Sequence, residues 1–270
     1  MITVAAACAI AASALTTQSV ARIIGLDDRR SVSYLEGERY RAVGVVAVAH
    51  GKRVDGGTGT LINDRMTVLT AFHNVYHDGT TGPVGELQVP LERIFFVVGD
   101  RLRSQRTFYR VRSVSPFRES SALILPDEDD LAVLTLERPV REAQPLRLRP
   151  LDPEEDGRGL GTVTHVGFHR DRNAGLDKMI QQCSFRERPP MATYPRSVNV
   201  LVHDCDSEGN ASGSPFLDQD DRIVAVHLGG SPRYLRKPGK PFDPSYNFNV
   251  ARRITSEVQV FVDKEDQNPF

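Results

Sequence analysis

The chain has 270 residues, which is enough for one large core or two modest ones, and 34 basic against 35 acidic side chains leave a net charge of −1. This balance gives no electrostatic reason to expect nucleic acid or an anionic membrane as a partner. Short basic groups such as residues 101–103 and Arg252-Arg253 are interpreted as solvated surface.

The first 21 residues contain no charged side chain and are rich in alanine, with small residues at 12–14 and 19–21 that suit a signal peptidase. We therefore expect residues 1–22 to be a signal or propeptide and the protein to be secreted or periplasmic, without membrane contact after processing. The alternative is a short membrane helix, but Ala, Ser and Thr make the stretch weakly apolar.

Short alternating or apolar runs separated by turn residues predict an all-β protein. The first set of expected strands is followed by a proline- and acid-rich connector at 149–156 and then by a second set, and Asp55-Gly56-Gly57 is expected to be a hairpin turn. We expect two six-stranded antiparallel barrels, at 23–145 and 146–270, and a C-terminal helix at 254–264. The expected strands are 42–49, 58–62, 67–70, 94–98, 108–114, 131–136, 162–168, 179–185, 198–202, 215–217, 223–228 and 246–250.

Three cysteines are present, and Cys8 lies in the expected signal. The expected strands 179–185 and 197–203 can pair as a hairpin, which brings Cys183 and Cys205 close enough for a disulfide in an exported protein. The alternative is two reduced, buried thiols.

Three residues have the types and local settings of a hydrolytic triad in the order His73, Asp130, Ser212. A serine hydroxyl is a poor nucleophile at neutral pH, so it needs an imidazole to accept its proton and a carboxylate to orient that imidazole. An esterase of the α/β-hydrolase type would need parallel strands alternating with helices and the order Ser, Asp, His. Neither is present in this sequence.

Residues 57–62 leading into 67–73, then Asp130-Leu-Ala-Val-Leu, Ser212-Gly-Ser-Pro and 223–230, resemble chymotrypsin-like serine proteases of the bacterial kind, similar to glutamyl endopeptidases, over residues 23–262. The resemblance implies a chymotrypsin-like fold and a monomeric serine endopeptidase that acts on polypeptides without a cofactor. It favours Asp130 over the neighbouring Asp129, and Ser212 over Ser214. No metal site is predicted, because the His73 and His77 pair has no third ligand nearby.

The same resemblance assigns the oxyanion hole to the backbone N–H groups of Asn210 and Ser212. Relatives usually have glycine where Asn210 stands, but asparagine also tolerates left-handed conformations. Many animal relatives have aspartate at the position of Ala211, which pairs with a new α-amino group after zymogen cleavage. That pair cannot form here, and we expect processing near Ile23 to place an ammonium group near the specificity pocket instead.

The resemblance also assigns substrate binding to Ser207 and His227, whose hydroxyl and imidazole can bind a carboxylate, and to the strand edge at Gly229 and Gly230. Cleavage after Glu or Asp is the resulting prediction. Asp206 argues against it, because basic-specific relatives carry their pocket aspartate at this position. The alternative function is a catalytically inactive homologue that binds peptides or proteins, as the departures at Asn210 and Ala211 suggest.

Overall fold

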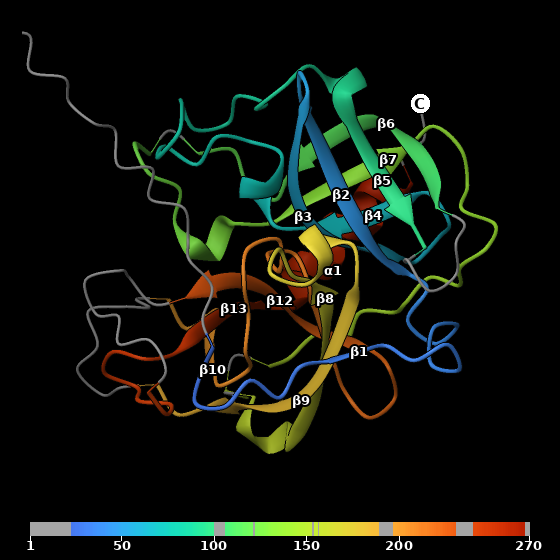
Figure 1. The fold of residues 1–270 in the computed structure, drawn as a ribbon. Helices are drawn as coiled ribbons and strands as arrows, with labels where there is room; N and C mark the ends of the chain where they lie inside the picture. Colours follow the sequence, from blue (N-terminus) through green and yellow to red (C-terminus); the bar gives the residue numbers. More distant parts are fainter. Residues whose placement is uncertain are drawn as a thin grey trace, which may run out of the picture.

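A computed structural model describes residues 23–99, 106–120, 122–152, 154–155, 157–188, 197–230 and 240–267. Its strands form two barrels that lie one above the other, the first in blue to green and the second in yellow to orange (Figure 1). The chain has the predicted all-β, chymotrypsin-like architecture. No helix within these ranges is both long enough and apolar enough to cross a membrane.

The first barrel closes in the order β2-β3-β4-β7-β6-β5. Buried and exposed positions alternate along much of β6, as expected for a strand with one face toward a core. Apolar side chains such as Val46, Leu61 and Phe96 fill the interior. The strands are β2 (Val43–His50), β3 (Arg53–Ile62), β4 (Thr67–Thr70), β5 (Ile94–Val98), β6 (Thr107–Pro116) and β7 (Ala132–Leu136).

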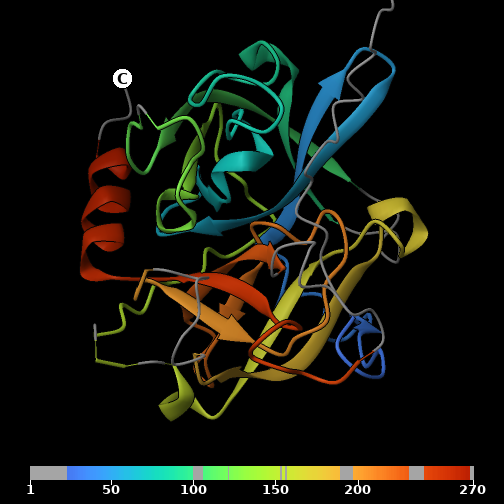
Figure 2. The same ribbon diagram turned by 90° about the vertical axis from the view of Figure 1, so that its left-hand side faces the viewer.

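The predicted hairpin turn at Asp55-Gly56-Gly57 is wrong, because these residues lie inside β3. The β2–β3 hairpin, which projects from the barrel in Figure 2, turns at 51–52, with His50 paired to Arg53. Instead, the two glycines allow neighbouring segments to pack closely against the backbone of β3. A Cβ on Gly57 would lie 2.3 Å from the Asn74 side-chain amide, and one on Gly56 would lie 1.9 Å from the Val46 carbonyl oxygen.

The second barrel runs β9-β10-β13-β12-β11-β8 and closes because β8 also pairs with β9, while the short β1 (Arg30–Ser31) adds to β9. The last strand begins three residues later than predicted. Val163, Phe185 and Phe216 belong to its core. The strands are β8 (Thr162–Phe168), β9 (Lys178–Arg186), β10 (Val200–His203), β11 (Pro215–Leu217), β12 (Ile223–Gly230) and β13 (Asn249–Arg253).

A third apolar cluster joins the barrels and includes Leu69 and Leu131 of the first and Val226 of the second. The C-terminal helix α1 (Ser256–Asp266), red in Figure 2, packs Val258 and Val262 onto this cluster. The helix was predicted two residues earlier. The Thr255 side chain accepts a hydrogen bond from the Val258 N–H and so caps its first turn.

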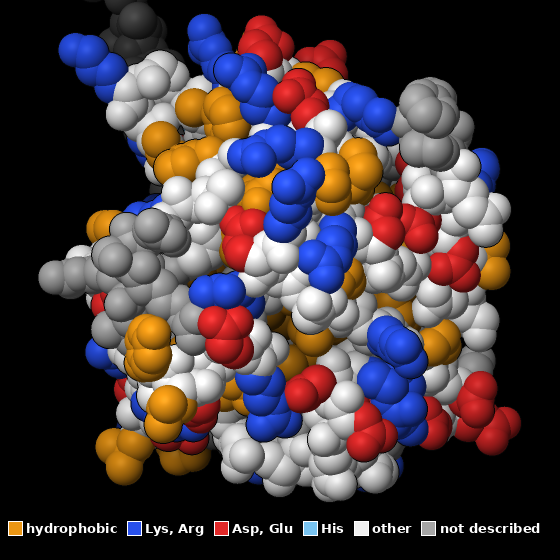
Figure 3. Space-filling view, turned by 90° about the vertical axis from the view of Figure 1, so that its right-hand side faces the viewer, with side chains coloured by type: hydrophobic (Ala, Val, Ile, Leu, Met, Phe, Trp, Pro, Cys, Tyr) orange, Lys and Arg blue, Asp and Glu red, His pale blue; other side chains and the backbone are white. Residues whose placement is uncertain are grey.

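The surface is strongly charged. Figure 3 shows basic side chains gathered in a band across one face, with acidic ones among and around them. Several surface arginines pair with carboxylates, as in Arg39 Nη2 with Asp221 Oδ1 at 2.7 Å. Exposed pairs of this kind add little stability. The interpretation of Arg252 and Arg253 as solvated surface is wrong, because both side chains are buried and donate hydrogen bonds to the carbonyls of Glu128 and Asp152. Residues 101–103 lie outside the described residues.

Candidate active site

The imidazole of His73 is held by the carboxylate of Asp130, which lies between the 3-10 turn Asp127–Asp129 and β7. His73 lies in the 3-10 turn Phe72–Asn74 directly after β4, and Phe72 anchors this turn in the core. Its Nδ1 lies 2.7 Å from Asp130 Oδ2, and its backbone N–H donates to Asp130 Oδ1 at 3.0 Å. Asp129 instead faces Arg118. The bond at Nδ1 orients the ring, and the bond from the backbone N–H holds the carboxylate in place. Nε2 is left available to accept a proton.

Burial by itself would lower the pKa of His73. The adjacent charge of Asp130 and its hydrogen bond outweigh this effect, so that the pKa of His73 is raised above 6.5. The pair therefore favours the imidazolium form, which a general base must reach after accepting a proton.

Ser212 lies in the loop before β11, where the chain turns sharply at Gly213 with a φ of 87°. A Cβ on Gly213 would lie 2.0 Å from the Thr58 carbonyl oxygen, so the loop rests directly on the first barrel. The Ser212 hydroxyl donates to the Leu228 carbonyl at 3.1 Å and makes no hydrogen bond to His73 among the described residues. Ser214 is fully buried. Only Ser212 of these two serines lines the cleft.

The backbone N–H groups of Asn210 and Ser212 are oriented by the carbonyls of the residues before them, which both accept hydrogen bonds. The Gly209 carbonyl accepts from Arg170 N at 2.5 Å, and the Ala211 carbonyl accepts from Ser214 N at 2.9 Å. Because a trans peptide directs its N–H opposite to its C=O, the following N–H groups of Asn210 and Ser212 point the other way. Neither has an acceptor among the described residues. Asn210 has a φ of 76°, the left-handed conformation expected of it.

A cleft of about 540 Å³ brings these groups together. His73 and Asp130 line it from the first barrel, and Asn210 and Ser212 line it from the second. Gly229 and Gly230, at the end of β12, form part of its wall. The His77 Nδ1 lies 2.9 Å from Thr81 Oγ1, so this imidazole has a partner separate from that of His73.

The predicted specificity residues lie deeper than expected. Ser207 and His227 are fully buried and do not line the cleft. His227 Nδ1 lies 3.2 Å from His203 Nε2, and burial together with nearby imidazoles lowers the pKa of His227 well below 6.5. Contact between these residues and a substrate side chain stays a prediction.

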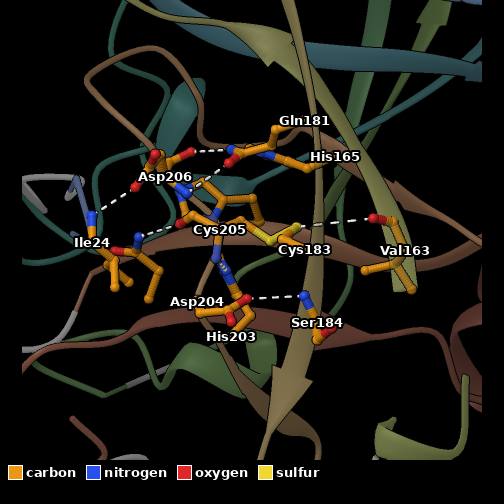
Figure 4. The surroundings of a disulfide bond; sticks show 12 residues. Ile24, Val163, His165, Gln181, Cys183, Ser184, His203, Asp204, Cys205 and Asp206 are labelled. Atoms are coloured by element: carbon orange, nitrogen blue, oxygen red, sulfur yellow. Dashed lines mark hydrogen bonds between the residues drawn. A yellow bond between two sulfur atoms is a disulfide. The ribbon is translucent and has the colours of Figure 1, made fainter. Parts of the chain in front are cut away.

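Asp206 binds the N-terminal segment. Its Oδ1 accepts from Ile24 N at 2.6 Å, as Figure 4 shows, and its Oδ2 accepts from Asp28 N at 3.1 Å. Burial raises the pKa of Asp206 to about 6. Both oxygens of this carboxylate are thus occupied by backbone amides. Processing near Ile23 stays a prediction, and residues 1–22, including Cys8, lie outside the described residues.

Comparison with known proteins identifies the family. The model of the trypsin-like peptidase domain matches residues 57–226, which is more than half of the chain. The chain belongs to the trypsin-like peptidase family. Its fold is similar to that of a Glu endopeptidase solved in complex with MPD, with a TM-score of 0.63, 16% identity, and coverage of 91% of this chain and 100% of that one.

The peptidase also resembles in fold the scabies mite inactivated protease paralogue S-I1, with a TM-score of 0.61, 18% identity, and coverage of 88% of this chain and 100% of that one. A comparison with curated proteins finds no matching sequence.

The disulfide predicted for this peptidase is confirmed. Cys183 of β9 and Cys205 after β10 are bonded, with their Cα atoms 5.2 Å apart (Figure 4). The alternative of two reduced thiols is wrong. The bond lies beside the core of the second barrel, shortly before the loop that carries Ser212.

Sequence patterns missed several residues that hold the peptidase cleft. Asn74 donates through Nδ2 to Thr70 Oγ1 at 2.9 Å and to the Ser212 carbonyl at 2.8 Å. The Thr58 N–H also donates to the Ser212 carbonyl, at 2.8 Å. Asn74 directly follows the candidate base and Thr58 lies in the family motif at 57–62, so both carried a signal, whereas nothing local marked Arg170.

Proposed function

We propose that this peptidase is an exported serine endopeptidase that acts through His73, Asp130 and Ser212. The observation that carries the proposal is the pair of hydrogen bonds from His73 to Asp130 in the same cleft as Ser212. The two N–H groups without acceptors beside Ser212 support it further, because an inactive binding module has no need of them.

The reaction begins when the Ser212 hydroxyl leaves the Leu228 carbonyl and turns toward His73 Nε2. His73 accepts the hydroxyl proton while Oγ attacks the substrate carbonyl carbon. The negative charge that develops on the carbonyl oxygen is stabilised by the N–H groups of Asn210 and Ser212, each worth about 3 kcal/mol in related sites. His73 then donates the proton to the leaving amine, and water resolves the acyl-enzyme by the same route.

The substrate backbone is proposed to lie along Gly229 and Gly230, where an extended peptide can add as a strand and glycine permits close approach. For the residue before the scissile bond we keep the prediction of Glu or Asp, with His227 and Ser207 as its determinants. Asp206 does not line the cleft, and its oxygens accept from Ile24 and Asp28.

Export is proposed from residues 1–22 and is compatible with the disulfide, since such bonds persist in oxidising compartments. N-terminal sequencing of the secreted enzyme is expected to begin close to Ile23. A mature start far from this position would contradict the processing step.

A fluorophosphonate probe tests the catalytic proposal. Wild type and Ser214→Ala are expected to be labelled, because Ser214 is buried outside the cleft, whereas Ser212→Ala is not. Absence of labelling in correctly processed wild type would favour the peptide-binding homologue. A mass-spectrometric cleavage profile of a peptide library, with Ser212→Ala as control, tests the acidic preference. Cleavage mainly after Lys, Arg or bulky apolar residues would refute it.

A further inference from the structure

Thr58 connects three parts of the molecule through one hydroxyl. It lies in β3 of the first barrel and is fully buried. Its Oγ1 accepts from the Phe168 N–H at 3.0 Å and lies 2.9 Å from the Asn210 carbonyl oxygen. A backbone N–H can only donate and a carbonyl can only accept, so the single hydroxyl proton must go to Asn210. The orientation of the hydroxyl is therefore fully determined.

The Asn210 backbone is held on both sides. Its own carbonyl accepts from Thr58, and the preceding Gly209 carbonyl accepts from Arg170 N. Asn210 has a φ of 76°, a left-handed conformation that asparagine tolerates at a higher cost than glycine, so hydrogen bonds that hold both of its peptide planes help to keep it. Together, the hydrogen bonds to the carbonyls of Gly209 and Asn210 determine the direction of the Asn210 N–H, which faces the cleft.

Thr58 also holds the other side of the nucleophile loop, since its backbone N–H donates to the Ser212 carbonyl at 2.8 Å. One residue of the first barrel thus fixes the carbonyls of residues 210 and 212 in the second. Phe168 and Arg170, which complete the arrangement, flank the end of β8. The cleft lies between the barrels, so this contact couples their packing to the position of the Asn210 amide.

We propose that the Thr58 hydroxyl is a positioning residue for the oxyanion hole, holding the Asn210 N–H toward the oxygen that becomes negatively charged. The inference rests on the proposed function. It predicts a defect in kcat, because the Asn210 hydrogen bond strengthens as charge develops and contributes little to substrate binding before that.

Thr58→Val removes the hydroxyl and keeps the shape of the side chain. We expect its kcat on a peptide substrate to fall roughly ten- to a hundred-fold, while KM stays within about two-fold of the wild-type value. The fall in kcat is smaller than that caused by removing a hydrogen-bond donor of the oxyanion hole altogether. Thr58→Ser is expected to restore most of kcat. The matched control is Thr60→Val, which lies two residues along the same strand and is buried, and whose hydroxyl has no partner among the described residues.

An unchanged kcat in Thr58→Val, no rescue by Thr58→Ser, or an equal loss in Thr60→Val would each overturn the proposal. Thr58→Ala takes the place of the valine variant if the latter does not fold. Wild type that neither turns over nor is labelled defeats the proposed function alone. Crystal structures then decide the role of Thr58: a Gly209–Asn210 peptide that rotates in Thr58→Val supports it, and one that keeps the wild-type conformation refutes it.

Discussion

Acidification from pH 7.5 to 5.5 is expected to destabilise the second barrel through four buried histidines: His165, His169, His203 and His227. Burial, reinforced by nearby positive charges and imidazoles, lowers the pKa of each well below 6.5. The rings of His165 and His227 lie 5.4 Å apart, so a proton on one also disfavours a proton on the other. The folded protein keeps all four neutral, and the unfolded chain does not.

The direction in which stability changes with pH follows from the number of protons bound by the folded and unfolded states. Below pH 6.5 the unfolded state binds more protons than the folded state, so the histidine contribution to stability is complete above this pH and decreases as pH falls. Each histidine whose folded-state pKa lies below the interval loses about 1 kcal/mol over it, so the four together lose a few kcal/mol.

Groups with a raised pKa oppose this loss. Burial raises the pKa of Asp206 and of Asp266 to about 6, so each favours the folded state as pH falls; Asp206 returns about 1 kcal/mol over the interval. The raised pKa of His73 acts in the same direction, because its contribution is present at low pH and is lost as pH rises through the folded-state pKa. We expect a net loss of a few kcal/mol, a large part of the usual stability of a domain.

Urea unfolding at both pH values measures the effect, and His165→Phe tests its origin. The ring of His165 stacks on Phe216 at 4.7 Å, and Gln181, its hydrogen-bond partner, also donates to the Asp206 carbonyl. Phenylalanine therefore keeps the stacking and leaves Gln181 with an acceptor. We expect the pH-dependent loss to shrink by about 1 kcal/mol in this variant. His50→Gln, a partly exposed control, is expected to behave as wild type.

Equal stability at the two pH values, or a loss that His165→Phe does not reduce, would show that the four histidines do not govern acid sensitivity.

Three further predictions concern the catalytic groups and the disulfide. Asp130→Asn is expected to lower kcat roughly 10⁴-fold. The activity of this variant should also rise at a lower pH than that of wild type, because neutral His73 is the active form and Asp130 raises the pKa of His73. An unshifted pH profile would count against the pairing of His73 with Asp130. Asn210→Gly should keep near wild-type kcat while Asn210→Ala loses roughly ten-fold, since glycine accepts a φ of 76° and alanine resists it; equal rates would refute this. Replacing Cys183 and Cys205 by alanine should cost about 3 kcal/mol in urea unfolding, from a separation of 22 residues; a loss below about 1 kcal/mol would contradict it.

Local patterns in the sequence were sufficient for most of the fold. The strand at 162–168 has the predicted bounds, and the C-terminal helix lies two residues from its predicted position. The family motif Asp130-Leu-Ala-Val-Leu also favoured Asp130 over Asp129, and the two carboxylates have different partners, although Asp129 lies in a 3-10 turn and not in an extended segment. These features depend on the periodicity of burial and on turn residues, which neighbouring positions specify.

Where partners come from distant segments, the sequence was silent or misleading. Asp55-Gly56-Gly57 has the composition of a turn, yet Asn74 and Val46 make it a strand where only glycine fits. Asp206 was weighed from its position in the sequence alone, which gave no sign that its oxygens bind amides 182 and 178 residues earlier. A buried polar group must find a partner, and local sequence does not say which segment supplies it. Residue types and their periodicity determined the strands and the candidate triad, whereas the packing of one barrel on the other decided which groups complete the cleft.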